Sequence, residues 1–279
     1  MKKSRKTTKI LSLVLALALA LVTLTACAEK APASSSDPAP SSAGSAAKPL
    51  DGVTLNIGTS GLFGPFSYYA DDGKTLIGYD IDLFAALQEK LGFSISGDGI
   101  QAMTYSALTT SVGQGKLDLA AAALCVTDER KEVMDFSDTY CDSGLTVMIN
   151  KTATSGITGV DSLAGKKVAV EKGTASHAYA DKYLQDAIVE VHDAITTAYA
   201  ALEQNKVDAV IQDGPGCAFY IKTNPNTNAE IVGEEFNQGQ SPYAVAFKKN
   251  FEYADQFKTA LAELLADGTL DELYDKWCK

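Results

Sequence analysis

From residue 53 to its end, the chain alternates short apolar runs with amphipathic segments. Residues 53–58 alternate apolar and polar positions, which is typical of a half-buried strand. Residues 80–91 place leucine and phenylalanine on one helical face, and Gly92 follows as the residue type that commonly ends a helix. The same pattern predicts strands at residues 93–96, 119–124, 145–149, 166–170, 207–213 and 243–247, and helices at residues 105–113, 175–186, 195–204, 215–221, 253–266 and 270–277.

Strands that alternate with helices indicate the α/β class, with a mostly parallel sheet covered by helices on both faces. The pattern restarts after Gly144, so the chain contains two α/β blocks. The strand at residues 243–247 and the two helices that follow it in the sequence are surplus to the second α/β block. Periodicity alone does not assign them to either block.

The N-terminus has the features of an export signal. Residues 10–24 are apolar but too short to span a bilayer comfortably. They end in Leu24-Thr25-Ala26-Cys27, which resembles the recognition box of a lipoprotein signal peptidase. That resemblance implies cleavage before Cys27 and a lipid on its sulfur, so residues 1–26 would be the signal peptide. The alternative is an ordinary signal peptide followed by an incidental cysteine. The basic residues that precede the apolar run are Lys2, Lys3, Arg5, Lys6 and Lys9.

Residues 28–48 are almost wholly alanine, proline, serine and glycine, and they cannot bury a core. We therefore predict that residues 27–48 are a lipidated cysteine and a disordered tether. A flexible chain of this length spans on the order of 25 Å. The protein would then work at the outer face of the cytoplasmic membrane, at the cell surface or in the periplasm, and would contact the membrane only through its lipid.

Charge and motif content exclude several classes of function. Because residues 1–26 carry five cations and no acid, their removal takes the formal net charge from −11 to −16. Such an acidic body argues against a nucleic-acid partner. His177 and His192 lack metal-ligand spacing, and no phosphate-binding loop or GxGxxG motif is present, so no metal or cofactor is expected. The spacing of the remaining cysteines supports no particular disulfide; they are Cys125, Cys141, Cys217 and Cys278.

One cation follows the predicted buried strand at residues 119–124. The strand leads into the polar turn Thr127-Asp128-Glu129, which presents Arg130. A guanidinium is a fork of donors that fits a carboxylate. The residue is therefore a candidate for binding an anionic ligand, and the alternative is a pair with a structural aspartate.

An ordered set of short motifs covers essentially all of the chain beyond the tether. The set resembles the extracellular solute-binding proteins of family 3, the receptors of ABC importers for polar amino acids such as glutamine and basic amino acids. Its members are Gly64-Pro65-Phe66, Gly78-Tyr79-Asp80-Ile81-Asp82-Leu83, Lys116-Leu117-Asp118-Leu119, Thr127-Asp128-Glu129-Arg130, Asp135-Phe136-Ser137, Gly173-Thr174, Val207-Asp208-Ala209-Val210, Asp267-Gly268-Thr269 and Lys276-Trp277.

The resemblance implies an α/β fold of the two-lobed, type II periplasmic-binding-protein kind, in which the chain crosses twice between lobes. Carried over to this sequence, the first lobe is residues 49–143 plus 243–279, and the second is residues 144–242. The crossings would lie near residues 143–144 and 241–242.

The resemblance also implies roles for residues that would hold an amino-acid zwitterion. Arg130 would bind the α-carboxylate, assisted by the helix start at Thr174 and Ala175, where free N–H groups and the helix dipole favour an anion. Asp213, at the end of a strand, would bind the α-ammonium. The alternative for Asp213 is an N-cap on the helix that begins near Pro215, and both roles can coexist.

The same resemblance also implies contacts to the side chain of the ligand. Phe63 and Tyr105 match positions where the family places aromatic rings around the ligand, and the alternative for each is ordinary core packing. Ser60 and Gln212 match polar contacts to the ligand side chain.

Three residues depart from the family pattern and leave the specificity open. Cys125 replaces the usual serine or threonine, and a thiol is a poor hydrogen-bonding group. Ala123 replaces a frequent glycine or serine and offers only its backbone. Glu171 stands where a glutamine receptor tends to carry lysine, which favours a ligand that donates hydrogen bonds or is cationic. Alternatively, Glu171 pairs with Lys167 or Lys172 in solvent.

These features predict a monomeric, lipid-anchored receptor, not an enzyme. It would close on a free polar or basic L-amino acid and deliver it to the permease of an ABC importer. The first alternative is an enzyme on the same fold, a cyclohexadienyl or arogenate dehydratase, for which Glu171 is the candidate acid. The second is a sensory or partner-binding module that never contacts a permease.

Overall fold

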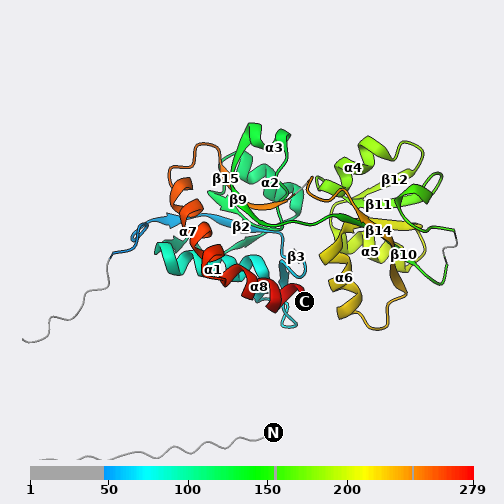
Figure 1. Ribbon diagram of the computed structural model, residues 1–279, viewed down its shortest axis with the longest axis horizontal. Helices are drawn as coiled ribbons and strands as arrows, with labels where there is room; N and C mark the ends of the chain where they lie inside the picture. The colour runs from blue at the N-terminus through cyan, green and yellow to red at the C-terminus, as the bar shows by residue number, and fades with distance from the viewer. Residues whose placement is uncertain (1–46, 154–155, 241) are drawn as a thin grey trace, which may run out of the picture. The chain divides into compact units, whose positions relative to one another are not determined.

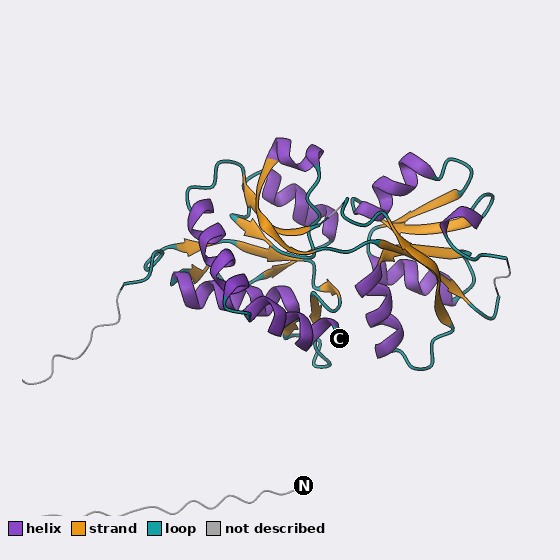
Figure 2. Cartoon of the chain, in the orientation of Figure 1, coloured by secondary structure: helices purple, strands orange, loops and turns teal. Residues whose placement is uncertain are grey.

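The computed structural model describes residues 47–153, 156–240 and 242–279 of the chain. The predicted leader, the lipidation site at Cys27, most of the tether and Ser241 at the second crossing lie outside these ranges. Figures 1 and 2 show two mixed sheets, each flanked by helices. In the described part, no helix combines the length and the apolar character needed to cross a bilayer.

The first sheet has five strands in the order β7-β2-β8-β15-β9. The strand β2 runs parallel to β7 and β8, whereas β15 runs antiparallel to β8 and β9. Two small sheets accompany it, a parallel β1–β6 pair and an antiparallel β3-β4-β5 sheet. The bounds are β1 Thr54–Leu55, β2 Ile57–Thr59, β3 Leu62–Phe63, β4 Ser67–Tyr69, β5 Leu76–Ile77, β6 Ser94–Ile95, β7 Gln101–Ala102, β8 Leu119–Ala120, β9 Met134–Cys141 and β15 Tyr243–Lys248.

Five helices belong with this sheet, and we call the whole assembly the first lobe. Helix α1 packs against α7 and α8, α2 packs against β2, β8 and β15, and α3 packs against β9. The apolar face of α1 is buried as its periodicity predicts, and Gly92 ends the helix with φ 87°. The bounds are α1 Tyr79–Leu91, α2 Tyr105–Gly113, α3 Asp128–Val133, α7 Ala254–Ala266 and α8 Thr269–Cys278.

The second sheet has the strand order β12-β11-β13-β10-β14, and with its helices it forms what we call the second lobe. The strand β11 is parallel to β12 and β13, and β10 is antiparallel to β13 and β14. The bounds are β10 Leu145–Asn150, η1 Val160–Ser162, β11 Lys167–Glu171, α4 Ala175–Tyr183, β12 Ile188–His192, α5 Ile195–Glu203, β13 Ala209–Asp213, α6 Gly214–Thr223 and β14 Ala229–Phe236.

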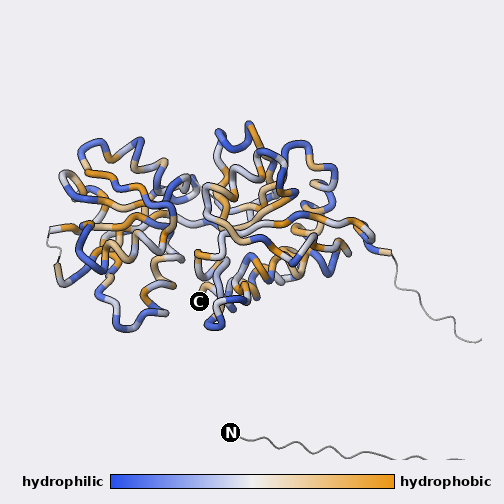
Figure 3. The backbone as a smooth tube through the Cα atoms, turned by 180° about the vertical axis from the view of Figure 1, so that it is seen from behind, coloured by the Kyte–Doolittle hydropathy of each residue, from blue (hydrophilic) through white to orange (hydrophobic). Residues whose placement is uncertain are grey.

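The strands that enter and leave the second lobe make both sheets mixed rather than mostly parallel. In each five-stranded sheet, two strand pairs are parallel and two are antiparallel. The antiparallel pairs arise because the chain leaves the first sheet after β9, crosses the second and returns as β15. In Figure 3 the hydrophobic colouring is concentrated along the strands of the two sheets.

Two predictions around Arg130 were wrong in their local structure. The predicted strand at residues 119–124 is only Leu119–Ala120, and the apolar residues after it form a buried loop. The predicted polar turn is the N-terminus of α3, so Arg130 lies on a helix. Sequence periodicity also missed β9, β12 and β14, because their burial alternates irregularly or is slight.

Asp80 holds the buried loop in place. Its carboxyl is fully buried and accepts hydrogen bonds from the Ala123 amide at 2.8 Å and from Tyr140 Oη at 2.6 Å. These bonds fix Ala123 at φ 49°, a conformation that non-glycine residues rarely adopt. Burial raises the pKa of Asp80 to about 6, against the lowering effect of both hydrogen bonds.

We expect Asp80→Ala to reduce the free energy of unfolding by about 2–4 kcal/mol, because it leaves a buried amide and a buried hydroxyl without an acceptor. Urea denaturation would measure the change. Asp128→Ala is the control, since that carboxylate is fully exposed and its loss should leave the free energy of unfolding nearly unchanged. Equal effects of the two substitutions would show that Asp80 does not hold the loop.

Candidate functional site

Arg130 is positioned by the start of α3 and reaches from the first lobe to the second. Thr127 caps the helix by accepting a hydrogen bond from the Arg130 amide at 3.3 Å. The guanidinium Nη1 donates to the Cys125 carbonyl at 2.6 Å and to Tyr105 Oη at 3.2 Å. Nη2 donates to the carbonyl of Gly173, in the second lobe, at 2.7 Å. The charge also lies over the Tyr105 ring, 5.3 Å from its centroid.

These contacts do not make Arg130 part of a structural ion pair. Its hydrogen bonds go to two carbonyls and a hydroxyl, and in the described ranges no carboxylate lies within 4 Å of the guanidinium. The alternative of a pair with a structural aspartate is therefore not what the structure shows. A guanidinium carries more N–H donors than these contacts occupy, so donors remain for an anionic ligand.

The start of α4 lies next to Arg130. Thr174 is the N-cap and accepts a hydrogen bond from the His177 amide at 3.3 Å. The amides of Ala175 and Ser176 belong to the first turn, whose N–H groups have no carbonyl partner one turn earlier. Arg130 and Thr174 line one cavity of about 580 Å³, which also borders Gly173, His177, Ala178 and Asp181. The arrangement can hold an anion between a guanidinium and a helix N-terminus.

Asp213 ends β13 in the second lobe. It occupies the N-cap position of α6, but its side chain makes no capping hydrogen bond. Instead, Tyr243 Oη of the first lobe donates to its Oδ2 at 2.7 Å. Burial raises the pKa of Asp213 to about 6, whereas the Tyr243 hydrogen bond and the charge of Arg130 lower it. Sequence reasoning missed Tyr243, whose role depends on the return of the chain as β15.

Glu171 ends β11 beside β13, and its side chain is 5% exposed. Burial raises its pKa to about 7; a hydrogen bond from the Ile195 backbone lowers it, and the charge of Asp213 raises it further. A carboxyl with such a pKa is near half protonation at neutral pH. It can accept a hydrogen bond from a ligand or transfer a proton.

The alternative that Glu171 pairs with a lysine in solvent was wrong. Lys167 lies 3.8 Å from Glu190, and Lys172 lies 4.0 Å from Asp193. Both lysine side chains are more than half exposed, whereas Glu171 is buried.

Ala123 and Cys125, which depart from the family pattern, offer a ligand only backbone groups and a neutral thiol. The Cys125 thiol donates weakly to the Ala123 carbonyl at 3.8 Å. Burial, with a further contribution from Asp213, raises the pKa of Cys125 to about 12, so the thiol stays protonated. Its carbonyl, which binds Arg130, is the group that shapes the site.

Three further predicted residues are buried. Ser60 is buried, with its Oγ 3.2 Å from Ser67 Oγ, and no described contact joins it to Arg130 or Asp213. Gln212 is 3% exposed. The Phe63 ring is buried and stacks on Phe66 with ring centroids 5.5 Å apart.

Two phenylalanines and two glycines interlock the lobes. The Phe63 ring of the first lobe occupies the space that a Cβ would take on Gly216 of α6. In return, the Phe219 ring of α6 occupies the space beside Gly64 of the first lobe. Phe219 also contacts Tyr68, with ring centroids 4.9 Å apart. Beside this contact lies a cavity of about 330 Å³, lined by Leu62, Phe63, Gly64, Tyr68, Ile195, Thr196, Tyr199, Ala200, Gly216, Phe219, Tyr220, Thr223 and Asn224.

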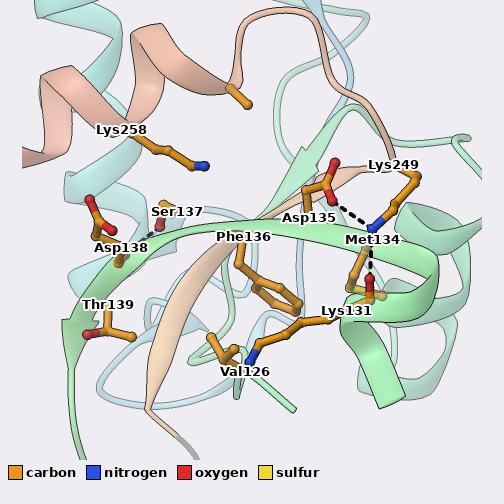
Figure 4. A pocket seen from close by; sticks show the side chains of 11 residues that line it. Val126, Lys131, Met134, Asp135, Phe136, Ser137, Asp138, Thr139, Lys249 and Lys258 are labelled. Carbon is orange, nitrogen blue, oxygen red and sulfur yellow. Dashed lines mark hydrogen bonds and ion pairs between the residues drawn. The ribbon is translucent and has the colours of Figure 1, made fainter. Parts of the chain in front are cut away.

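Figure 4 shows another cavity, of about 610 Å³, beside β9. Two of its charged groups pair with each other, because Lys249 Nζ lies 2.9 Å from Asp135. The same Nζ donates a hydrogen bond to the Lys131 carbonyl at 2.7 Å. None of the predicted ligand residues lines it. Size alone therefore does not make it the better candidate.

Comparisons with known proteins agree on the kind of molecule. The family model for bacterial extracellular solute-binding proteins, family 3, matches residues 55–279. The L-cystine-binding protein TcyJ of Escherichia coli (strain K12) is 31% identical over 224 residues, which are 80% of this chain and 82% of the relative.

Two solved structures have similar folds. An ancestral arginine-binding protein bound to arginine has a TM-score of 0.75 and 35% identity, over 81% of this chain and 98% of that one. An ancestral amino acid-binding protein, a precursor of cyclohexadienyl dehydratase, has a TM-score of 0.72 and 30% identity. The match covers 81% of this chain and 96% of that one.

Buried carboxyls should make the ligand-free protein more stable in mild acid. The pKa values of Asp80, Asp213 and Glu171 are raised to about 6, 6 and 7, so the folded state binds more protons than the unfolded state between about pH 4 and 7. The free energy of unfolding should rise as the pH falls from about 8 to about 5, by up to about 1.4 kcal/mol per pH unit for each group.

Thermal unfolding across this pH range would measure the effect. Glu171→Gln should flatten the profile near pH 7. Glu190→Gln, at the half-exposed partner of Lys167, should leave it unchanged. A melting temperature that falls steadily from pH 8 to pH 5 would contradict the prediction.

Proposed function

Because the chain belongs to the bacterial extracellular solute-binding proteins of family 3, we propose that it captures a free amino acid between its two lobes and delivers it to an ABC permease. The family and its two-lobed α/β fold, both predicted from the sequence, are confirmed. The relatives described above are named as binding proteins rather than enzymes.

The observation that carries the proposal is the pair Arg130 and Asp213. The two residues lie in different lobes, have opposite charges and interact electrostatically. An amino-acid zwitterion has a matching pair of charges. Its carboxylate would be bound by Arg130 and the amides of Ala175 and Ser176, and its ammonium by Asp213.

A ligand bound in this way contacts both lobes at once. It therefore binds the closed form better than any form with separated lobes, and this difference drives closure. Closure is the change that a permease can recognise. The Tyr105 ring, beneath the Arg130 guanidinium, would form one wall of the site. Phe63, which lines the cavity of about 330 Å³, would form another.

The membrane attachment is part of the same proposal. The family is extracellular, and the sequence at Cys27 favours a lipid anchor followed by a tether. Residues 27–48 would keep the receptor near the permease while leaving it free to collect ligand. Each binding event involves one chain, so a monomer is sufficient.

Arg130→Ala should weaken ligand binding at least about 30-fold, since truncating one side of a buried charge contact costs about 2–5 kcal/mol. The full-length protein in detergent would first be screened against free amino acids by its melting temperature. A ligand present at about a hundred times its dissociation constant adds roughly 2.7 kcal/mol. Calorimetric titration would then compare the variants.

Lys131→Ala provides the matched control, because Lys131 is the next cation along α3 and its Nζ pairs with exposed Asp128 at 3.0 Å. It should bind as the unaltered protein does. Unchanged affinity in a folded Arg130→Ala variant would remove Arg130 from the site.

Glu171 favours one second candidate, a dehydratase. A buried carboxyl whose pKa burial raises to about 7 suits a general acid that ejects water. One structural relative is a precursor of cyclohexadienyl dehydratase, although that relative is itself an amino acid-binding protein by name.

Incubation of the protein with prephenate or arogenate decides between the two functions. We expect no turnover above the uncatalysed rate, since a receptor needs binding alone. Turnover that Glu171→Gln abolishes, with Glu190→Gln unaffected, would establish the dehydratase instead.

A further inference from the structure

Three oxygen-bearing side chains meet at one end of the second sheet. Glu171 ends β11, and the parallel register that pairs Val168 with Ala209 places Gln212 of β13 beside it. Tyr199 comes from α5, which packs against both strands. Burial raises the pKa of Tyr199 well above its ordinary value, and the Cys217 thiol and the Asp213 and Glu171 carboxyls raise it further.

Two of these groups are buried without a well-formed hydrogen bond. Gln212 and Tyr199 are 3% and 7% exposed, and within the described ranges neither Gln212 Oε1 nor Tyr199 Oη has a hydrogen-bond partner of good geometry. The Cys217 thiol, a weak hydrogen-bonding group, is the neighbour that acts on the Tyr199 hydroxyl. Leaving a buried polar atom unsatisfied costs about 1–3 kcal/mol. Native proteins therefore retain such atoms mainly where something else binds them.

The charges around the cluster are not balanced. Glu171 and Asp213 are both acids and repel each other, and Arg130 is the cation that acts on Asp213. Lys167 and Lys172 are engaged with surface acids. A zwitterion with a neutral side chain would leave this excess of negative charge, whereas a ligand with one additional positive charge would neutralise it.

Space for a side chain adjoins the cluster. Ile195, whose backbone hydrogen-bonds Glu171, and Tyr199 both line the cavity of about 330 Å³ between the lobes. Phe63 of the first lobe lines the same cavity. Aromatic faces attract cations and planar groups. The aromatic residues that line this cavity therefore suit a charged head group, as the oxygens of the cluster also do.

We propose that Glu171, Gln212 Oε1 and Tyr199 Oη form a side-chain subsite for a cationic group, so that the ligand is a basic amino acid of the arginine or lysine type. The proposal rests on the proposed function, because Arg130 and Asp213 must hold the main-chain end of the same ligand. Glu171 supplies the charge, and the Gln212 and Tyr199 oxygens accept hydrogen bonds from the head group. Tyr199 is a specificity residue that no sequence motif indicated.

The test compares L-arginine with L-citrulline, which has nearly the same length and a planar head group but no side-chain charge. Titration calorimetry on the full-length protein in detergent at pH 7.5 should show arginine binding at least about 30-fold more tightly, as expected for a buried charge contact. L-Lysine should also bind more tightly than its neutral analogue norleucine.

Variants assign the preference to the cluster. Glu171→Gln should lose most of the preference for arginine while changing citrulline affinity less than about threefold, and Tyr199→Phe should weaken arginine several-fold, consistent with the loss of one hydrogen bond to a charged group. Glu190→Gln, the same substitution at the exposed partner of Lys167, should leave both affinities unchanged.

The possible outcomes distinguish a failure of this inference from a failure of the proposed receptor function. If no free amino acid binds, the receptor function itself is wrong. If neutral amino acids bind as tightly as arginine and lysine, the receptor function stands and the cationic subsite is overturned. If Glu171→Gln keeps the full preference, the charge is recognised elsewhere. The comparison in the unaltered protein decides the ligand class even if a variant fails to fold.

Discussion

The junction of the two lobes depends on the compensation of buried charge. Burial raises the pKa of both Asp213 and Glu171, and of the two only Asp213 is directly stabilised by Arg130. The first lobe supplies the guanidinium and the second supplies both acids. A buried charge is tolerated only when it is paired or hydrogen-bonded, so the partners on each side constrain how the lobes meet. The proposed ligand binding follows from the same constraint, since a ligand with complementary charges would complete the compensation of these buried charges.

The contacts that already join the lobes are of two kinds. One polar contact, from Lys222 Nζ to the Lys279 carbonyl at 2.7 Å, involves no predicted ligand residue. Two others, Arg130 to the Gly173 carbonyl and Tyr243 to Asp213, engage groups that a ligand would use. A ligand carboxylate and ammonium would therefore be exchanged for these contacts rather than simply added to them. The apolar ones, Phe63 against Gly216 and Phe219 against Gly64, involve no ligand-binding charge. Larger residues in place of the glycines would overlap the rings, so these positions set how closely the lobes approach.

The part of the site nearest Arg130 is built around a loop rather than a strand. Asp80, on α1, binds the Ala123 amide and so holds the loop whose Cys125 carbonyl accepts from Arg130. The motif Gly78-Tyr79-Asp80 was visible in the sequence as a family fragment, but its physical role was not. A carboxylate and an amide separated by 43 positions meet only in the folded chain.

The sequence by itself determined the helices with strong periodicity, the family, and the residue types that a zwitterion requires. The apolar face of α1 and the acidic and basic residues at strand ends carry that information locally, because side-chain spacing reports on burial within one element. Tertiary structure alone decided that Glu171 is buried, that Asp213 binds Tyr243 rather than capping its helix, and that Tyr199 faces the same acids. These facts depend on contacts between residues far apart in the chain, and burial and pKa are properties of the assembled surroundings rather than of any local pattern.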